Sequence, residues 1–295
     1  MSRAASPSTR KIYGVRRVCA VWALARSTVY WRKTHTKSIS RRGPQGPYTD
    51  KELLKGIRSF LEQSPFHGEG YRKVHMALRL RGLRASPLRI MRIMRENGLQ
   101  APKRTGHPHG PKAHNGIIRT DKINEMWGTD MTSTLTVKEG TASIFLAVDH
   151  CSLELVGIHA AKRGTRFEAL EPLRQGIKRN FGKYSQAAAA GLRLRHDHGS
   201  QFMSEVYQSE LKFLGIASSP AFVREPQGNG IAERFIRLLK ENLLWVKSFD
   251  TVEELRLTLL EFQEIYNNTW MIGRHQYKTP AQVKRQQTGA LRQAA

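Results

Sequence analysis

Residues 127–267 alternate between strand-like and helix-like segments, and this order leaves few folds open to the chain. Three strand-like runs come first, over 127–137, 143–148 and 153–160, and short turns join them. Apolar periodicity then predicts helices over 166–180, 204–214, 231–247 and 252–267, with strands over 192–196 and 216–223. A meander of strands followed by such alternation is typical of a mixed α/β sheet.

The first hundred residues carry only helical patterns. A short helix over 13–24 and a second one that starts at Ser27 and ends near Lys33 predict a small helix-turn-helix. A longer helix stops at Ser64-Pro65. A further pair follows, in which 71–81 runs into Gly82, and Ser86-Pro87 opens a helix that ends at Gly98.

Charge divides the chain into two unequal halves. The net charge is +25 and the isoelectric point is about 10.6, which indicates a polyanion as partner. Residues 1–120 carry 26 basic and 5 acidic side chains, whereas residues 121–295 carry 23 and 19. The basic half is therefore expected to grip nucleic acid, the alternative being a basic tail for a ribosome or an acidic membrane.

The helix after Ser86 has the composition of a DNA-reading helix. Its apolar side is expected to hold Leu88, Met91 and Met94, and its basic side Arg89, Arg92 and Arg95. Such a helix packs on one side and meets phosphates or guanine edges on the other. Arg26, in the break of the first helix pair, is a further DNA-binding candidate. The alternative is a solvated basic face on a plain helical bundle.

Three acidic residues on separate predicted elements are the candidate site. Asp130 lies in a strand, Asp197 follows another strand, and Glu233 lies on a helix. Three carboxylates of this kind can hold two divalent cations at a phosphodiester, because hard cations prefer oxygen ligands. Asp149, at the end of a strand, is an alternative acid, and we interpret it as a structural turn residue.

The Glu233 helix adds a basic face. Glu233, Arg237 and Lys240 fall in one sector, opposite an apolar face. The Gly-rich entry over 226–230, with Asn229, is typical of a loop beside a substrate, which makes Asn229, Arg237 and Lys240 DNA-binding candidates. A surface ion pair between Glu233 and Arg237 is the alternative.

These motifs resemble a known family. The runs 127–132 (WGTDMT), 196–202 (HDHGSQF) and 229–235 (NGIAERF) are similar to the three acidic motifs of the DDE integrase superfamily, with the 35-residue final spacing found in insertion-sequence transposases and retroviral integrases. Lys240 also matches. The runs 266–267, 274–275 and 279–281 resemble the closing signature of OrfB-type transposases, and 70–99 resembles the helix-turn-helix before their core.

The resemblance implies a ribonuclease-H-like mixed sheet preceded by small all-α helix-turn-helix modules. It implies strand cleavage and transfer at the terminal inverted repeats of a mobile element, with Mg²⁺ or Mn²⁺, two ions, held by Asp130, Asp197 and Glu233, and with Lys240 on DNA near the cut. His198 departs from the usual residue after the second aspartate, which is Asn, Arg or Gln. The alternatives are a ribonuclease-H-like nuclease that joins no ends and an inactive DNA-binding derivative.

The expected organisation follows from these patterns. We expect a basic helix-turn-helix and linker over 1–46, a helix-turn-helix DNA-binding domain over 47–105, a linker over 106–124, a catalytic core over 125–285 and a tail over 286–295. The expected partner is double-stranded DNA, both element ends and target, bound by a homo-oligomer, with a helix-turn-helix protein as a possible partner and no membrane. Two cysteines and no long apolar run predict a cytoplasmic protein.

Overall fold

The computed structural model describes residues 4–34, 46–102, 118, 120–221 and 229–294, and it divides into a unit of residues 1–47 and a unit of residues 48–295. In the first unit, α1 (Val15–Val21) and α2 (Arg26–Thr34) form the predicted helix pair. The second helix already begins at Arg26, so Ser27 lies inside it and is not its N-cap, which corrects that prediction. The linker that was predicted at the end of the 1–46 unit falls mostly on residues 35–45, which lie outside the described residues.

The second unit begins with three helices, α3 (Asp50–Gln63), α4 (Tyr71–Leu80) and α5 (Pro87–Glu96). Thr49 and Glu52 form a capping box at the start of α3, and the Ser86 side chain accepts a hydrogen bond from the Arg89 backbone N–H at the start of α5. The ends of these helices match the prediction, since Gly82 and Gly98 adopt φ of +85° and +67°.

The apolar side of α5 differs from the prediction. Ile90, Ile93 and Met94 are buried against α3 and α4, whereas Leu88 is 68% exposed and Met91 is only half-buried. The buried side of α5 is therefore the i, i+3, i+4 stripe that starts at Ile90. This stripe contains no arginine, so its burial places no charge in the core.

The five-stranded sheet has the order β3-β2-β1-β4-β5. Its strands are β1 (Met126–Thr136), β2 (Gly140–Asp149), β3 (Leu155–Ala161), β4 (Arg193–His196) and β5 (Ala217–Pro220). The first three pair antiparallel, while β4 pairs parallel with β1 and β5 parallel with β4. The predicted mixed α/β class is confirmed.

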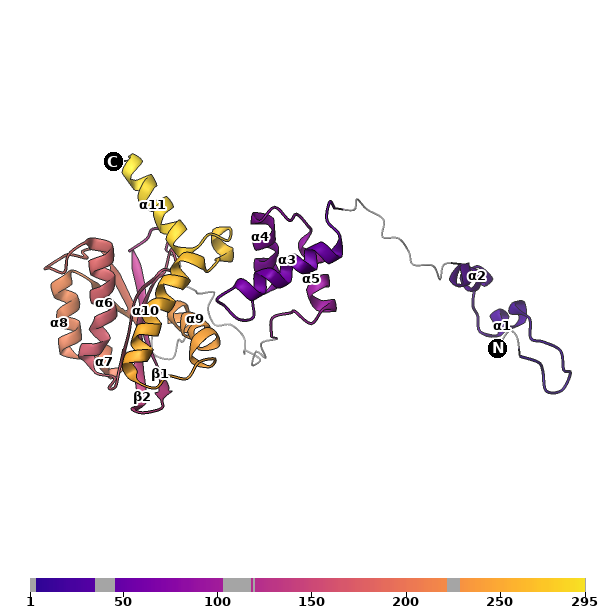
Figure 1. Ribbon diagram of the computed structural model, residues 1–295, viewed down its shortest axis with the longest axis horizontal. Coiled ribbons are helices and arrows are strands. Elements are labelled where there is room, and N and C mark those ends of the chain that lie inside the picture. Colours follow the sequence, from indigo (N-terminus) through magenta and orange to yellow (C-terminus); the bar gives the residue numbers. More distant parts are fainter. Residues whose placement is uncertain (1–3, 35–45, 103–117, 119, 222–228, 295) are drawn as a thin grey trace. The chain divides into compact units, whose positions relative to one another are not determined.

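Helices cover both faces of the sheet (Figure 1). One face packs on α6 (Arg166–Phe181), α7 (Ser200–Met203) and α8 (Glu205–Leu214). The other packs on α9 (Gly230–Leu239), a π-helical turn over Lys240–Leu244 and α10 (Val252–Thr269). Alternate residues of β2 serve the two cores, with Ile144 and Leu146 on the α10 side and Phe145 and Ala147 on the α6 side. The helix α6 lies so close to β3 that a Cβ on Gly157 would stand 2.0 Å from the Pro172 carbonyl oxygen.

The C-terminal segment is helical. A short 3-10 helix over Gly273–His275 leads into α11 (Pro280–Ala294), so the expected tail over 286–295 continues a helix through Ala294. The domain boundary at 285 therefore falls inside α11. Nowhere in the described ranges is there a helix long and apolar enough to cross a membrane.

Candidate active site

Strand register brings Asp130 and Asp197 together. In the parallel pair of β1 and β4, Gly128 stands opposite Arg195. Asp130 and Asp197 each lie two residues further along, so the same register sets them side by side on one face at the point where β4 ends. Neighbouring strands lie about 4.8 Å apart. The strand register therefore leads the chain to Asp130 and Asp197 at neighbouring positions.

Glu233 approaches the same place from α9. It lies in the first turn of α9 with its side chain exposed, while Ile231, Ala232 and Phe235 bury the other side of the helix in the core. Burial and the negative charge of Asp197 raise the pKa of Glu233. The convergence of the three acids on one metal site stays a prediction.

Asp130 lies within electrostatic range of the other two acids. The pKa of Asp130 is raised to about 6, first by burial and then by the charges of Asp197 and Glu233. The backbone N–H of Met131 and the charge of Lys240 act in the opposite direction. Lys240 therefore lies near Asp130, although it sits in the π-helical turn and not in the regular helix that the sequence predicted.

Asn229 fixes the start of α9 against β1. Its side chain is buried, and its Nδ2 donates a hydrogen bond of 3.0 Å to the Thr129 carbonyl oxygen, next to Asp130. The prediction that Asn229 contacts DNA is therefore wrong for this conformation, because only 3% of the residue is exposed. A Cβ on Gly128 would lie 3.3 Å from Asn229 Oδ1 and 2.9 Å from His150 Nε2, so glycine is required for this close approach. Asn229 thus positions Glu233 relative to Asp130.

The loop after β4 is held by its own histidines. His196 contacts Ser218 Oγ at 2.9 Å through Nε2, and Asp197 Oδ1 accepts a hydrogen bond from the Gly199 backbone N–H. His198, the departure from the family pattern, contacts the Ala221 carbonyl oxygen at 2.6 Å through Nε2. The His198 side chain therefore connects the loop that holds Asp197 to the residue that follows β5.

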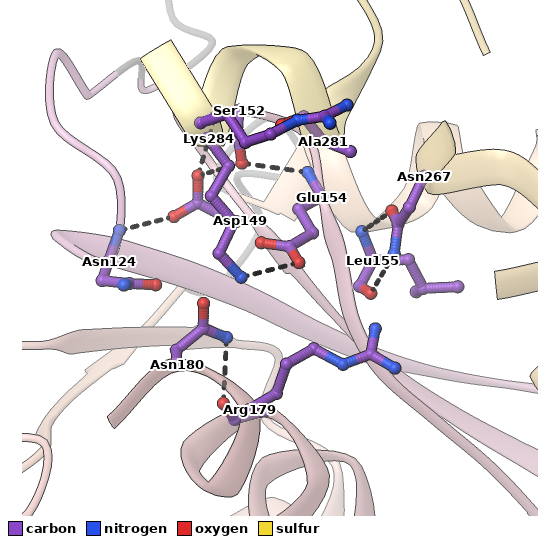
Figure 2. A network of polar contacts seen from close by, with 12 residues as sticks. Asn124, Asp149, Ser152, Glu154, Leu155, Arg179, Asn180, Asn267, Ala281 and Lys284 are labelled. Atoms are coloured by element: carbon purple, nitrogen blue, oxygen red, sulfur yellow. Dashed lines mark hydrogen bonds and ion pairs between the residues drawn. The ribbon is translucent and has the colours of Figure 1, made fainter. Parts of the chain in front are cut away.

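Asp149 has a structural role, as predicted. Figure 2 shows it at the turn between β2 and β3, where Oδ1 accepts hydrogen bonds from the backbone N–H and the hydroxyl of Ser152. Its Oδ2 accepts a third from the Asn124 backbone N–H. Burial raises the pKa of Asp149 despite these bonds. Because its oxygens are already committed to the turn and to the segment that enters β1, it is no alternative to the three acids.

The arginines of α5 are not freely exposed. Arg89 and Arg92 form ion pairs with Asp50 on α3, at 2.7 and 2.5 Å, and Arg92 also pairs with Glu96 at 2.7 Å. The sequence analysis missed this pairing, which holds α5 against α3. Arg95, Arg26 and Arg237 are exposed. For these three residues DNA contact stays a prediction, and for Arg89 and Arg92 it requires that DNA compete with Asp50.

A buried lysine is another residue that the sequence did not single out. The Nζ of Lys73 on α4 lies 2.8 Å from the centroid of the Trp270 ring and 3.7 Å from Glu69 Oε1. Burial lowers the pKa of Lys73 to about 7, although Glu69 opposes the shift. Glu69 and Lys73 are four residues apart in the sequence, but Trp270 reaches them only through tertiary packing, and the local sequence does not signal that contact.

Two known domains match this chain. The model of the HTH-like domain matches residues 49–106, and that of the integrase core domain matches residues 214–280, which include Glu233 and Lys240. The chain is also 25% identical over 243 residues to the transposase InsD for insertion element IS2A/D/F/H/I/K of Escherichia coli, covering 80% of this chain and 79% of that protein. The chain is homologous to insertion-element transposases.

The chain is also similar to a second InsD protein and to two solved structures. InsD for IS2-9 of Escherichia coli strain K12 is 25% identical, over 80% of this chain and 78% of that protein. Among solved structures, the simian T-cell lymphotropic virus intasome in complex with PP2A regulatory subunit B56 gamma has 22% identity and a TM-score of 0.48, over 79% of this chain and 74% of that chain. The HTLV-2 integrase catalytic core domain in complex with magnesium, in its trimeric form, has 21% identity and a TM-score of 0.41, over 55% of this chain and 96% of that chain.

The integrase core domain match lies within the unit that holds the mixed five-stranded sheet, which agrees with the predicted α/β class. The closing signature is structural. Asn267 exchanges hydrogen bonds with the backbone N–H and carbonyl of Leu155 (Figure 2), and Arg274 donates to the carbonyl oxygens of His150 and Cys151. Asn267 therefore holds the end of α10 against β3, and Arg274 holds the segment after α10 against the turn between β2 and β3.

Proposed function

We propose that this protein is a DNA transposase of the DDE polynucleotidyl transferase type, which cleaves and joins DNA strands at the ends of an insertion sequence. The observation that carries the proposal is that β1, the end of β4 and α9 place Asp130, Asp197 and Glu233 near one another, so that burial and then the charges of the other two acids raise the pKa of Asp130 to about 6. Like charges near one another disfavour the ionised form, so a cation nearby would stabilise these carboxylates. Homology to insertion-element transposases supports the same reading.

The donor chemistry of the three acids suits Mg²⁺ or Mn²⁺, because hard cations prefer oxygen ligands. Among the residues that the structure describes, no group of three or more His, Cys, Asp or Glu side chains is arranged so that it could hold a metal ion. We infer that Asp130, Asp197 and Glu233 would hold the ions. When bound, such a pair activates the attacking oxygen and neutralises the leaving oxygen of a phosphodiester.

The chain's own residues would position the substrate. Lys240, whose charge reaches Asp130, is placed to meet a phosphate next to the acids. Asn229 keeps α9, and with it Glu233, at a fixed distance from β1. The HTH-like domain and the basic first 120 residues would bind the element ends and the target, with a homo-oligomer assembled on the DNA.

The proposal is tested by strand-resolved cleavage of candidate element-end DNA in Mg²⁺. Asp130→Ala, Asp197→Ala and Glu233→Ala should each abolish cleavage and keep DNA binding, because each removes a carboxylate and no phosphate contact. Asp250→Ala is the matched control, since Asp250 is an exposed acid paired with Lys138. Cleavage by any of the three variants at the parental rate would refute the site. Hydrolysis without joined products would reduce the function to that of a nuclease.

A charge series at Lys240 tests its role separately. Lys240→Arg should keep much of the activity, Lys240→Ala should weaken binding at the cleavage position, and Lys240→Glu should be worse because it sets a like charge against phosphate. Strand-transfer rates at one ionic strength measure the series. Equal rates for all three variants would remove Lys240 from the site.

A further inference from the structure

The positive charge of the second half of the chain is concentrated at its C-terminal end. Residues 121–264 carry 18 basic and 19 acidic side chains, so this stretch is close to neutral. Residues 265–295 carry five basic side chains and no acidic one. The whole excess of the second half therefore lies in the segment formed by the end of α10, the 3-10 helix and α11. A cationic end on a neutral core indicates a contact with a polyanion.

A pocket of about 380 Å³ opens in this segment. Its wall is formed by Arg274, His275, Gln276, Lys278, Val283, Gln286 and Gln287, which include two cations and three amides and no carboxylate. Burial lowers the pKa of His275, so its ring adds no charge at neutral pH. The pocket therefore offers hydrogen-bond donors to an anion and no acid that would repel it.

The donors in the pocket are directed by neighbours. Lys278 is half-buried, and its Nζ donates a 2.6 Å hydrogen bond to Gln286 Oε1, which leaves two further N–H groups of the ammonium. The same bond turns the amide NH₂ of Gln286 away from Lys278 and makes it available as a donor. The loop contains two consecutive non-glycine residues in the left-handed region, Gln276 with a φ of 56° and Tyr277 with a φ of 64°. Such strain is retained where the surrounding structure over-determines it and is frequent at ligand sites.

The wall of the pocket is anchored to the core. Arg274 donates to the carbonyl oxygens of His150 and Cys151, and the Gln287 amide donates to the Asp121 carbonyl oxygen and accepts from the Ile123 backbone N–H. Lys284 of α11 pairs with Glu154 at 2.9 Å, beside the Asp149 turn in Figure 2. A ligand in the pocket would therefore be held in a fixed relation to the segment that enters β1.

We propose that the pocket between the 273–278 loop and α11 binds a phosphodiester of the DNA backbone, as a second contact outside the site of Asp130, Asp197 and Glu233. Lys278 and the amides of Gln276 and Gln286 supply the donors, and Arg274 adds charge while it holds the loop in place. Contacts of this kind position a duplex and read no sequence. The inference rests on the proposed function only in taking DNA as the polyanion.

The test is the salt dependence of DNA binding by the full-length chain, measured by fluorescence anisotropy with a mixed-sequence duplex. Lys278→Ala should reduce the slope of log affinity against log salt by roughly 0.9, the value for one phosphate contact, and weaken binding about fivefold to tenfold near 0.1 M salt. Lys278→Arg should keep the parental slope. Lys178→Ala is the matched control, because Lys178 is an exposed lysine in the last turn of α6.

The outcomes separate this inference from the proposed function. A Lys278→Ala chain with the parental melting temperature and the parental slope overturns the phosphate pocket. The same result for Lys178→Ala as for Lys278→Ala overturns it too, since any surface lysine would then act alike. A parental chain that binds DNA with the predicted Lys278 effect but never cleaves it contradicts the transposase proposal and leaves the phosphate contact standing.

Discussion

Asp130→Asn should make the metal-free protein more stable while it destroys activity. Burial and two neighbouring carboxylates raise the pKa of Asp130 from 3.8 to about 6. A carboxyl whose pKa is raised on folding does not destabilise the folded state at a pH below its unfolded pKa. The free energy of unfolding falls as the pH rises from that unfolded pKa through the folded pKa. At pH 7.5 the charged form therefore costs about 3 kcal/mol at most, since one pKa unit corresponds to 1.36 kcal/mol. The half-buried position of Asp130 lowers this to about 2–3 kcal/mol through solvent screening.

The assay is thermal and urea unfolding in EDTA, at pH 7.5 and at pH 5. At pH 7.5 the melting temperature of Asp130→Asn should exceed that of the parent by roughly 5–10 °C, at about 2–4 °C per kcal/mol for a unit of this size. At pH 5 Asp130 is mostly protonated in the folded parent, so roughly half of the difference should disappear. Mg²⁺ should stabilise the parent and not the variant. A variant that is no more stable than the parent at pH 7.5, or a difference that does not change with pH, would refute the reasoning. Asp250→Asn, an exposed acid, should change little at either pH.

Two further predictions concern the frame around the site. The free energy of unfolding of the parent should rise between about pH 7 and 10.5, because in this range Lys73 binds a proton in the unfolded state and not in the folded state. Urea titrations over this range should show a smaller rise for Lys73→Met. Gly157→Ala should lower the free energy of unfolding by roughly 1–3 kcal/mol, since its Cβ would meet the Pro172 carbonyl oxygen at 2.0 Å. Gly289→Ala in α11, where a Cβ meets nothing within 4 Å, is the control and should be neutral or stabilising.

Local sequence signals were enough to predict the elements and the positions of the acids. Period-2 and period-3.6 patterns depend on near neighbours, so β1, α6 and α10 lie where the patterns predicted them. Asp130 and Asp197 follow from the same logic, because a parallel sheet brings the ends of adjacent strands together. The domain boundaries and the DNA contacts of the exposed arginines stay predictions.

Several features that the prediction missed depend on partners far away along the chain. Arg89 and Arg92 pair with Asp50, 39 and 42 residues earlier. Asn229 bonds Thr129, 100 residues earlier, so its loop-like sequence did not reveal its burial. α11 is rich in glutamine and has a weak apolar side, and it is held by contacts such as Lys284 with Glu154, 130 residues apart. Pairings of this kind depend on the tertiary fold and leave no periodic trace in the sequence.

The parallel register of β1 and β4 has a consequence for the fate of this gene within a genome. The register that leads to Asp130 and Asp197 is set by the backbone pairing of residues 126–128 with residues 193–195, and neither acid takes part in that pairing. A mutated copy that has lost Asp130 would therefore keep its fold, keep its basic binding surfaces and accumulate at least as well as the intact protein. If the DNA-binding role proposed above is right, such a copy would occupy the same element ends without cutting them. Inactivated copies would then act as competitive inhibitors of transposition, and the decay of the active site would itself restrain the spread of the element.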